Sequence, residues 1–333
     1  MPAHAIAGLR FPHERMLLGR TKLAYVHLRN LLTDAKRDRT GRVFGYVAIW
    51  LADGIVVLYL QEGEVANATH SMDGETWHPI AIAEAIAKVP PEPESGDICF
   101  HEADDEQLAC MWEAQHTPAD PWPAELDIDN PRVLFPYIRA TTWDGMMEIA
   151  KDGARHYLVF RDGSVVRTFL ADDSEGPVPA RVLKLFDPSP RGGKVRARRW
   201  NVPPALPMQA SPALIGAYRD LIRRIVEHLQ SSGSSAAREL AESARAMLVE
   251  RHPVLMYFPI GLPGHTPVPT RDPVVTPQLL TPAIAAWVGE LLLATSDYGS
   301  TSPELVLSEL TRERRHMLQS AGFYELLPWT VTF

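Results

Sequence analysis

The sequence is poor in cysteine and has no long apolar run. Its 333 residues include only Cys99 and Cys110, which are too few for a disulfide framework, so we expect two reduced thiols. The longest apolar runs, at 46–52 and 55–60, are far shorter than the roughly 20 residues of a membrane-spanning helix. The first twenty residues contain charged side chains and no apolar segment typical of a signal peptide. The sequence therefore predicts a cytoplasmic protein that does not insert into membranes.

The chain also lacks the common catalytic and cofactor-binding motifs. It contains no Gly-rich phosphate loop, no dinucleotide-binding glycine pattern and no Gly-x-Ser-x-Gly turn. His101 and Glu102 begin like a zinc-protease motif, but Asp105 stands where the second histidine is required. Residues 127–130 begin like a calcium loop and then meet Pro131. We expect no cofactor, no metal and no catalytic residue, and interpret the chain as a non-enzyme.

The net charge of −8 is unevenly distributed. Residues 84–129 contain thirteen acidic side chains and one lysine, whereas the first 42 residues contain nine basic and three acidic ones. One interpretation is that these segments pair within the molecule or with a second copy of it. The other is that one of them recruits an oppositely charged partner. No domain is strongly basic, so we expect no nucleic-acid partner.

A pattern of short strands and tight turns occurs twice. Runs of β-branched and aromatic residues at 45–51, 55–60 and 64–69 alternate with Asp-Gly and Glu-Gly turns, and a similar pattern covers 145–169. Corresponding glycines mark the two copies: Gly45, Gly54, Gly63, Gly145, Gly153 and Gly163. We expect two related antiparallel β-meanders produced by internal duplication. The alternative is two unrelated meanders with the same turn chemistry.

Helices are expected around the first meander and throughout the last third of the chain. Apolar periodicity indicates helices at 25–35, 77–89 and 102–115, with a further strand at 96–101. From Ser211, a helix N-cap followed by proline, four helices with apolar faces follow. The last residues, 323–333, are apolar and either pack onto these helices or form a docking peptide.

These patterns predict an α+β fold with two related β-meander modules and short helices, followed by an all-α domain. The expected divisions are an α+β module at 1–116, a Pro-rich acidic connector at 117–136, a trimmed second β module at 137–190, a basic linker at 191–210 and a helical domain at 211–333.

The first module carries a recognisable order of motifs. A helix with Leu28 and Leu32 precedes Thr40-Gly41, and Gly63-Glu-Val-Ala-Asn-Ala and Gly96-Asp-Ile-Cys-Phe follow. This order, over residues of about 25–105, resembles the PATAN-domain family of bacterial signalling modules, with a partial second copy at 137–176. The resemblance implies a non-enzymatic role in signalling or motility control through protein contacts.

We therefore expect a regulatory or scaffolding protein that binds a protein partner, and we consider a homo-oligomer as well. The residues expected to contact a partner are Arg196, Arg198, Arg199, Trp200 and Trp329. One alternative is a small-molecule or nucleotide sensor with a pocket between the modules, lined by Trp143 and neighbouring aromatic residues. A second alternative is an unrecognised hydrolase or transferase.

Overall fold

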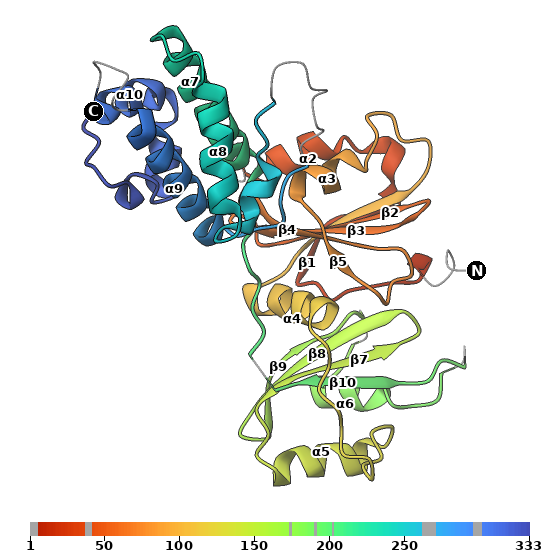
Figure 1. Ribbon diagram of the computed structural model, residues 1–333. Helices are drawn as coiled ribbons and strands as arrows, with labels where there is room; N and C mark the ends of the chain where they lie inside the picture. The colour runs from red at the N-terminus through yellow and green to blue at the C-terminus, as the bar shows by residue number, and fades with distance from the viewer. Residues whose placement is uncertain are drawn as a thin grey trace. The chain divides into compact units, whose positions relative to one another are not determined.

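The computed structural model describes residues 6–36, 42–172, 175–189, 192–201, 203–261, 271–295 and 302–333. It divides into two compact units, of which the first comprises Met1–Ile80 and Ala85–Pro207 and the second comprises Ala81–Glu84 and Met208–Phe333. The first unit contains two antiparallel sheets, and the second is helical (Figure 1). The expected α+β class with a helical C-terminal part is confirmed. Thr40 and Gly41, which contribute to the family resemblance, lie outside the described residues.

The first sheet has six antiparallel strands. Their spatial order is β1 (Arg15–Lys22), β6 (Asp97–Glu102), β2 (Gly45–Leu51), β3 (Gly54–Gln61), β4 (Glu64–Ser71) and β5 (His78–Pro79). A 3-10 turn at Leu23–Tyr25 and helix α2 (Leu28–Ala35) precede β2, and α3 (Ile82–Ala87) precedes β6. The central strands β2 and β3 are buried on both faces, which explains their continuous apolar sequence. The expected helix at 77–89 is shorter, because 78–79 pairs with β4.

The second sheet has four antiparallel strands, in the order β10 (Arg196–Trp200), β7 (Gly145–Lys151), β8 (Ala154–Arg161) and β9 (Ser164–Phe169). Helices α5 (Pro131–Ala140) and α6 (Val178–Lys184) accompany it. We expected irregular chain where α5 begins and where β10 lies. Both elements depend on contacts that local sequence does not reveal: α5 buries Leu134 and Ile138, and β10 pairs with β7.

The two sheets share one topology. In each, a helix precedes a three-stranded meander, a second helix follows, and a last strand pairs antiparallel with the first strand of the meander. Register shifts also fall at corresponding places, between Tyr59 and Leu60 and between Val159 and Phe160. The second module thus has more than the strands that we expected it to keep. Origin by duplication stays a prediction.

Two pairs of corresponding glycines allow the backbone to approach closely. A Cβ atom at Gly45 would collide with the carbonyl oxygen of His101 in β6, and one at Gly145 with that of Trp200 in β10. Gly63 and Gly163 have positive φ values of 77° and 69°. A Cβ atom at either would lie within 3 Å of the backbone at the end of α2 or α5. These glycines therefore fix how the helices and last strands dock, besides forming turns.

Helix α4 (Asp105–His116) lies between the two sheets (Figure 1). Asp104 caps it by accepting a hydrogen bond from the backbone N–H of Gln107 at 2.7 Å. One apolar core contains side chains from α4 and from facing strands of both sheets. Its largest buried members are Tyr46, Trp50, Tyr59, Trp112, Tyr157 and Trp200.

The helical unit has its own core. Its helices are α7 (Pro212–Ser231), α8 (Ala237–Val249), α9 (Pro277–Thr295), α10 (Pro303–Leu310) and α11 (Arg315–Ser320). Ser211 caps α7 as expected, accepting from the N–H of Leu214 at 3.1 Å. Trp329 and Val331 pack against the core, in agreement with one of the two interpretations of the terminal segment.

Helix α9 is the most apolar element of this unit. By length and composition alone, Pro277–Ala294 is sufficient to cross a membrane. Polar residues interrupt this segment, so it contains no long uninterrupted apolar run. About 56% of this window is buried. Ile284, Trp287 and Leu291 belong to the helical core, which accounts for the apolar composition.

Candidate functional site

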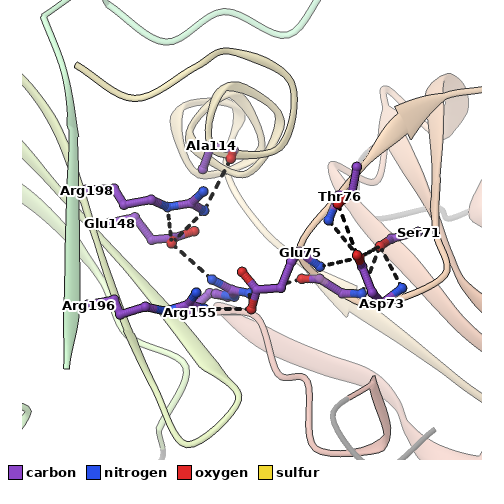
Figure 2. A network of polar contacts seen from close by, with 10 residues as sticks. Ser71, Asp73, Glu75, Thr76, Ala114, Glu148, Arg155, Arg196 and Arg198 are labelled. Carbon is purple, nitrogen blue, oxygen red and sulfur yellow. Dashed lines mark hydrogen bonds and ion pairs between the residues drawn. The ribbon is translucent and has the colours of Figure 1, made fainter. Parts of the chain in front are cut away.

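The basic run of the expected linker lies on β10, at the junction between the two sheets. Arg198 Nη2 lies 2.8 Å from Glu148 Oε1, and Arg196 Nη2 lies 2.6 Å from Glu75 Oε1 (Figure 2). Trp200 is buried and its Nε1 donates to the carbonyl oxygen of Thr117. The structure thus brings these residues together, but it uses them for contacts within the chain.

Arg199, the third of the arginines that we expected to contact a partner, also binds within the chain. Its Nη2 donates to the carbonyl oxygen of Pro121 at 2.7 Å, and its guanidinium lies 4.7 Å from the ring centroid of Trp122. Both partners belong to the acidic connector. A role of Arg196–Trp200 in binding a partner stays a prediction, with most of these side chains already engaged.

Glu148 and Arg155 form the centre of the junction (Figure 2). Both are almost completely buried, with 2% and 5% of their surfaces exposed, and their charged atoms are 3.2 Å apart. Arg155 Nη2 also donates to Glu75 Oε1 at 2.8 Å and to the carbonyl oxygen of Gly74 at 3.0 Å. A buried charge is tolerated only when partners and hydrogen bonds replace its hydration, and here they do so.

Opposite charges in this cluster keep Arg155 and Glu75 in their ionised forms. Burial lowers the pKa of Arg155, but the carboxylates of Glu148 and Glu75 outweigh burial and hold that pKa above its usual value. Burial raises the pKa of Glu75, while hydrogen bonds and charge from Arg196 and Arg155 bring it below its usual value. Sequence analysis missed Glu148, Arg155 and Glu75. The signals available in the sequence were Glu148 in the middle of the apolar strand β7 and Arg155 near the start of β8.

A loop after β4 presents Glu75 to the second sheet (Figure 2). Asp73 holds this loop by accepting hydrogen bonds from the backbone N–H groups of Glu75 and Thr76, at 2.8 and 2.7 Å, and from the Thr76 hydroxyl. The Thr76 backbone bond is the main reason why the pKa of Asp73 falls to about 2. The loop is therefore ordered by its own side chains before it meets Arg155.

The acidic and basic segments of the sequence meet in part within one chain. On the first sheet, Asp97 lies 2.8 Å from Lys22 and 3.0 Å from Arg20, and Glu102 lies 2.6 Å from Arg15. These contacts join β1 to β6. The intramolecular interpretation of the charge asymmetry is thus correct for these pairs.

A polar cavity of about 470 Å³ lies in the first unit, between elements that accompany both sheets. Its lining includes Gln107 of α4, Arg167 and Phe169 of β9, and Arg181 of α6. Arg181 is paired with Asp172 at 2.8 Å, and Arg167 is paired with Asp104 and Glu106 at the start of α4.

Trp143 does not line this cavity, contrary to our expectation for a pocket between the modules. Its ring packs at 5.3 Å from that of Phe160, and its Nε1 donates to Asn201 Oδ1 at 2.7 Å. Its apolar surface is used by the core beneath α5 and α6. A pocket between the modules lined by Trp143 and neighbouring aromatic residues stays a prediction.

Both cysteines are free and buried, as expected. Burial raises the pKa of the Cys99 thiol to about 11 and raises that of Cys110 further. Cys99 lines a small cavity of about 150 Å³ beside Tyr46, whose hydroxyl lies 2.9 Å from His101 Nδ1. Burial also raises the pKa of Tyr46 well above its usual value. These groups are therefore protonated at neutral pH, which makes Cys99 a poor nucleophile.

The outer edge of β9 differs from the equivalent edge of the first sheet. In the first sheet β5 pairs with Thr69 and His70 at the end of β4, whereas β9 pairs only with β8 within the described residues. Val165 and Val166 on β9 are 44% and 45% exposed. Their exposure and the unpaired strand edge give this side of the second sheet a surface on which another strand can add.

Comparison of the chain with protein-family models, curated proteins and solved structures finds no match. The resemblance to PATAN domains therefore stays a prediction based on the motifs of the first module.

Proposed function

We propose that this chain is a non-enzymatic regulatory or scaffolding protein that binds a partner protein at the open edge of β9. The observation that carries this proposal is the difference between β9 and β4. β5 pairs with Thr69 and His70 at the end of β4, while β9 has no second partner within the described residues and exposes two neighbouring valines. Edge strands are generally shortened, charged or covered, so an accessible one with apolar side chains is suited to adding a strand.

The form of the edge indicates how a partner binds. Val166 is the extra residue of a bulge, since Val165 pairs with Phe160 and Arg167 pairs with Val159. The bulge shortens the regular part of the edge and limits backbone pairing. A bound segment must therefore gain affinity from apolar side chains placed against Val165 and Val166 as well as from backbone hydrogen bonds. We propose an extended apolar segment of a partner protein as the occupant.

The junction supports this role by holding the edge in place. The ion pairs of Arg155 with Glu148 and Glu75, and of Arg167 with the start of α4, fix the second sheet to the first module. A surface that is ordered before binding loses less conformational entropy when a partner docks.

Selection of peptides against the purified full-length chain tests the proposal. We expect selected peptides to be extended and apolar, and to lose affinity at least about tenfold in Val165→Lys, since the lysine charge opposes apolar docking. Val133→Lys is the matched control, because Val133 is similarly exposed, at 41%, on α5. Backbone amides of β9 should become protected from hydrogen exchange in the complex. The proposal is wrong if Val165→Lys binds the peptides as wild type does, or if selection yields none that compete for β9.

A small-molecule sensor is the second candidate, and the polar cavity lined by Gln107, Arg167 and Arg181 favours it. Its volume of about 470 Å³ is within the usual range for ligand sites, about 300–1,000 Å³. Screening nucleotides and polar metabolites by thermal shift separates the two candidates. A ligand that stabilises wild type, and stabilises Arg181→Met less, supports the sensor. A hydrolase or transferase activity stays a prediction.

A further inference from the structure

A cavity of about 330 Å³ lies within the helical unit and is separate from the junction. Its apolar lining consists of Ile222 and Val226 of α7, Phe258 and Ile260 of the segment after α8, and Trp287 of α9. The side chain of Trp287 is fixed by a hydrogen bond from its Nε1 to the carbonyl oxygen of Ala241. The cavity therefore offers a hydrophobic space of a size that ordinary small ligands fill.

Two arginines on the rim already have anionic partners. Arg219 Nη1 lies 2.5 Å from Asp272 Oδ1. Arg223 is bound to both Asp220 and Glu227, at 2.5 and 2.8 Å. Glu227, the acidic residue of the lining, is thus neutralised as well. One further basic side chain of the lining has no carboxylate partner within the described residues, and it supplies the positive charge of the cavity.

That side chain is Arg238, in the first turn of α8. Its Nη1 donates to the carbonyl oxygen of Gly261 at 3.1 Å. Its Nε is buried and has no hydrogen-bond partner, and within the described part of the chain no carboxylate pairs with the guanidinium. The N-terminal end of a helix carries partial positive charge, which opposes a cation placed there. An anion beside Arg238 would offset both effects.

We propose that this cavity binds a small molecule with an apolar body and a single anionic head, of which a medium-chain carboxylate is the simplest example. The apolar body occupies the space lined by Ile222, Val226 and Trp287. The head accepts a hydrogen bond from Nη2 of Arg238, which the bond from Nη1 to Gly261 leaves available. A hydrogen bond between a guanidinium and a carboxylate is stronger than one between neutral groups.

Isothermal titration of the full-length chain with compounds of equal length tests the charge requirement. Octanoate is the probe, and octanol and octylammonium are its neutral and cationic counterparts. We expect octanoate to bind at one site, octanol to bind at least about tenfold more weakly, since hydrogen bonds to a charged group are the stronger ones, and octylammonium not to bind. From hexanoate to octanoate, affinity should rise roughly fourfold per methylene, the value expected for burying that group. Equal binding of octanol and octanoate, or no saturable binding of octanoate, would overturn the proposal.

Substitution of Arg238 identifies the group that recognises the head. Arg238→Gln keeps a donor for Gly261 but removes the charge, and we expect octanoate affinity to fall at least about tenfold while octanol binding is unchanged. Arg238→Lys keeps the charge but not the planar guanidinium and should give an intermediate affinity. Arg251→Gln, an equal charge change at an exposed position outside the cavity lining, should bind octanoate as wild type does.

Circular dichroism establishes that each variant is folded before it is titrated. If Arg238→Gln does not fold, the comparison of the three ligands with wild type still decides the proposal. Retention of octanoate binding by a folded Arg238→Gln protein would show that the head is recognised elsewhere and would contradict it. Because the peptides selected at β9 are not involved, failure of this test and failure of the proposed function are distinguishable.

Discussion

At the scale of the residue, buried polar groups in this chain are held by specific hydrogen bonds and have altered pKa values. His156 of β8 is 2% exposed, and its Nδ1 accepts a hydrogen bond from the backbone N–H of Ala171 at 3.1 Å. Burial is the main reason why the pKa of His156 falls to about 4. The side chain is thus neutral at pH 7, and protonation of Nδ1 would remove the bond to Ala171.

This pKa predicts a loss of stability in mild acid. The folded-state pKa of about 4 lies below the unfolded value of about 6.5, so the unfolded chain binds the proton more readily. The contribution of neutral His156 is fully present above pH of about 6.5 and is lost as pH falls toward 4. The two values correspond to about 3 kcal/mol in the free energy of unfolding at the acidic limit.

Urea denaturation between pH 4 and 7.5 measures this effect against His156→Asn. The asparagine keeps an acceptor for Ala171 and does not titrate, so the free energy of the variant should fall less with decreasing pH. His116, whose pKa is also lowered to about 4 by burial, contributes to both proteins. Identical pH dependence of the two proteins would contradict the assignment.

At the scale of the element, the turns determine where other segments dock. The β7–β8 turn consists of Asp152 and Gly153, with φ values of 49° and 80°. The N-terminal segment crosses this turn, since the N–H of Arg10 donates to the carbonyl oxygen of Gly153 and the N–H of Arg155 donates to that of Arg10. Gly153 therefore has two reasons to be glycine, its backbone conformation and this close crossing.

Replacing Gly153 by alanine separates the two reasons. A Cβ atom there would lie 2.5 Å from the carbonyl oxygen of Gly8, whereas one at Gly192, with a φ of 72°, would meet no atom of the described residues within 4 Å. We expect Gly192→Ala to cost about 1 kcal/mol for backbone strain alone, and Gly153→Ala to cost about 3 kcal/mol because the N-terminal segment must also move. Urea denaturation compares them, and equal losses would show that the crossing is unimportant.

At the scale of the whole molecule, the two units of the chain are built on separate hydrophobic cores. In the first unit the two sheets share the core around α4 and are joined by the buried charges of Glu148 and Arg155. In the second unit the helices enclose Tyr218, Trp287 and Phe323. The first unit is therefore expected to respond as one body to a change in the junction, with both sheets affected.

Glu148→Gln tests this connection. It leaves Arg155 and Arg198 facing a neutral group in a buried site, and removal of one member of a buried ion pair typically costs about 3–5 kcal/mol. We expect a loss of about 3 kcal/mol and reduced hydrogen-exchange protection in both β3 and β8. Glu62→Gln, which removes an exposed partner of Arg42, should change stability by at most about 1 kcal/mol. A loss confined to the second sheet would show that the junction does not couple the modules.

The sequence by itself determined the meanders, their turns and the onset of the helical unit. Runs such as 45–51 and 145–151, bounded by Gly-containing turns, form strands because local chain properties favour that conformation. The helix beginning after Ser211 follows from its cap and its apolar periodicity.

Only the tertiary structure decided the edge strands β1 and β10 and the candidate sites. β1 carries three basic residues and little alternation, and it becomes a strand because β6 supplies backbone partners and carboxylates. The partners of Arg155 and the residues that surround Arg238 likewise come from distant segments. Such contacts give no local pattern in the sequence, because they arise when the elements pack. Strand formation could be predicted from neighbouring residues, whereas the candidate sites depend on which charges and apolar surfaces remain after packing.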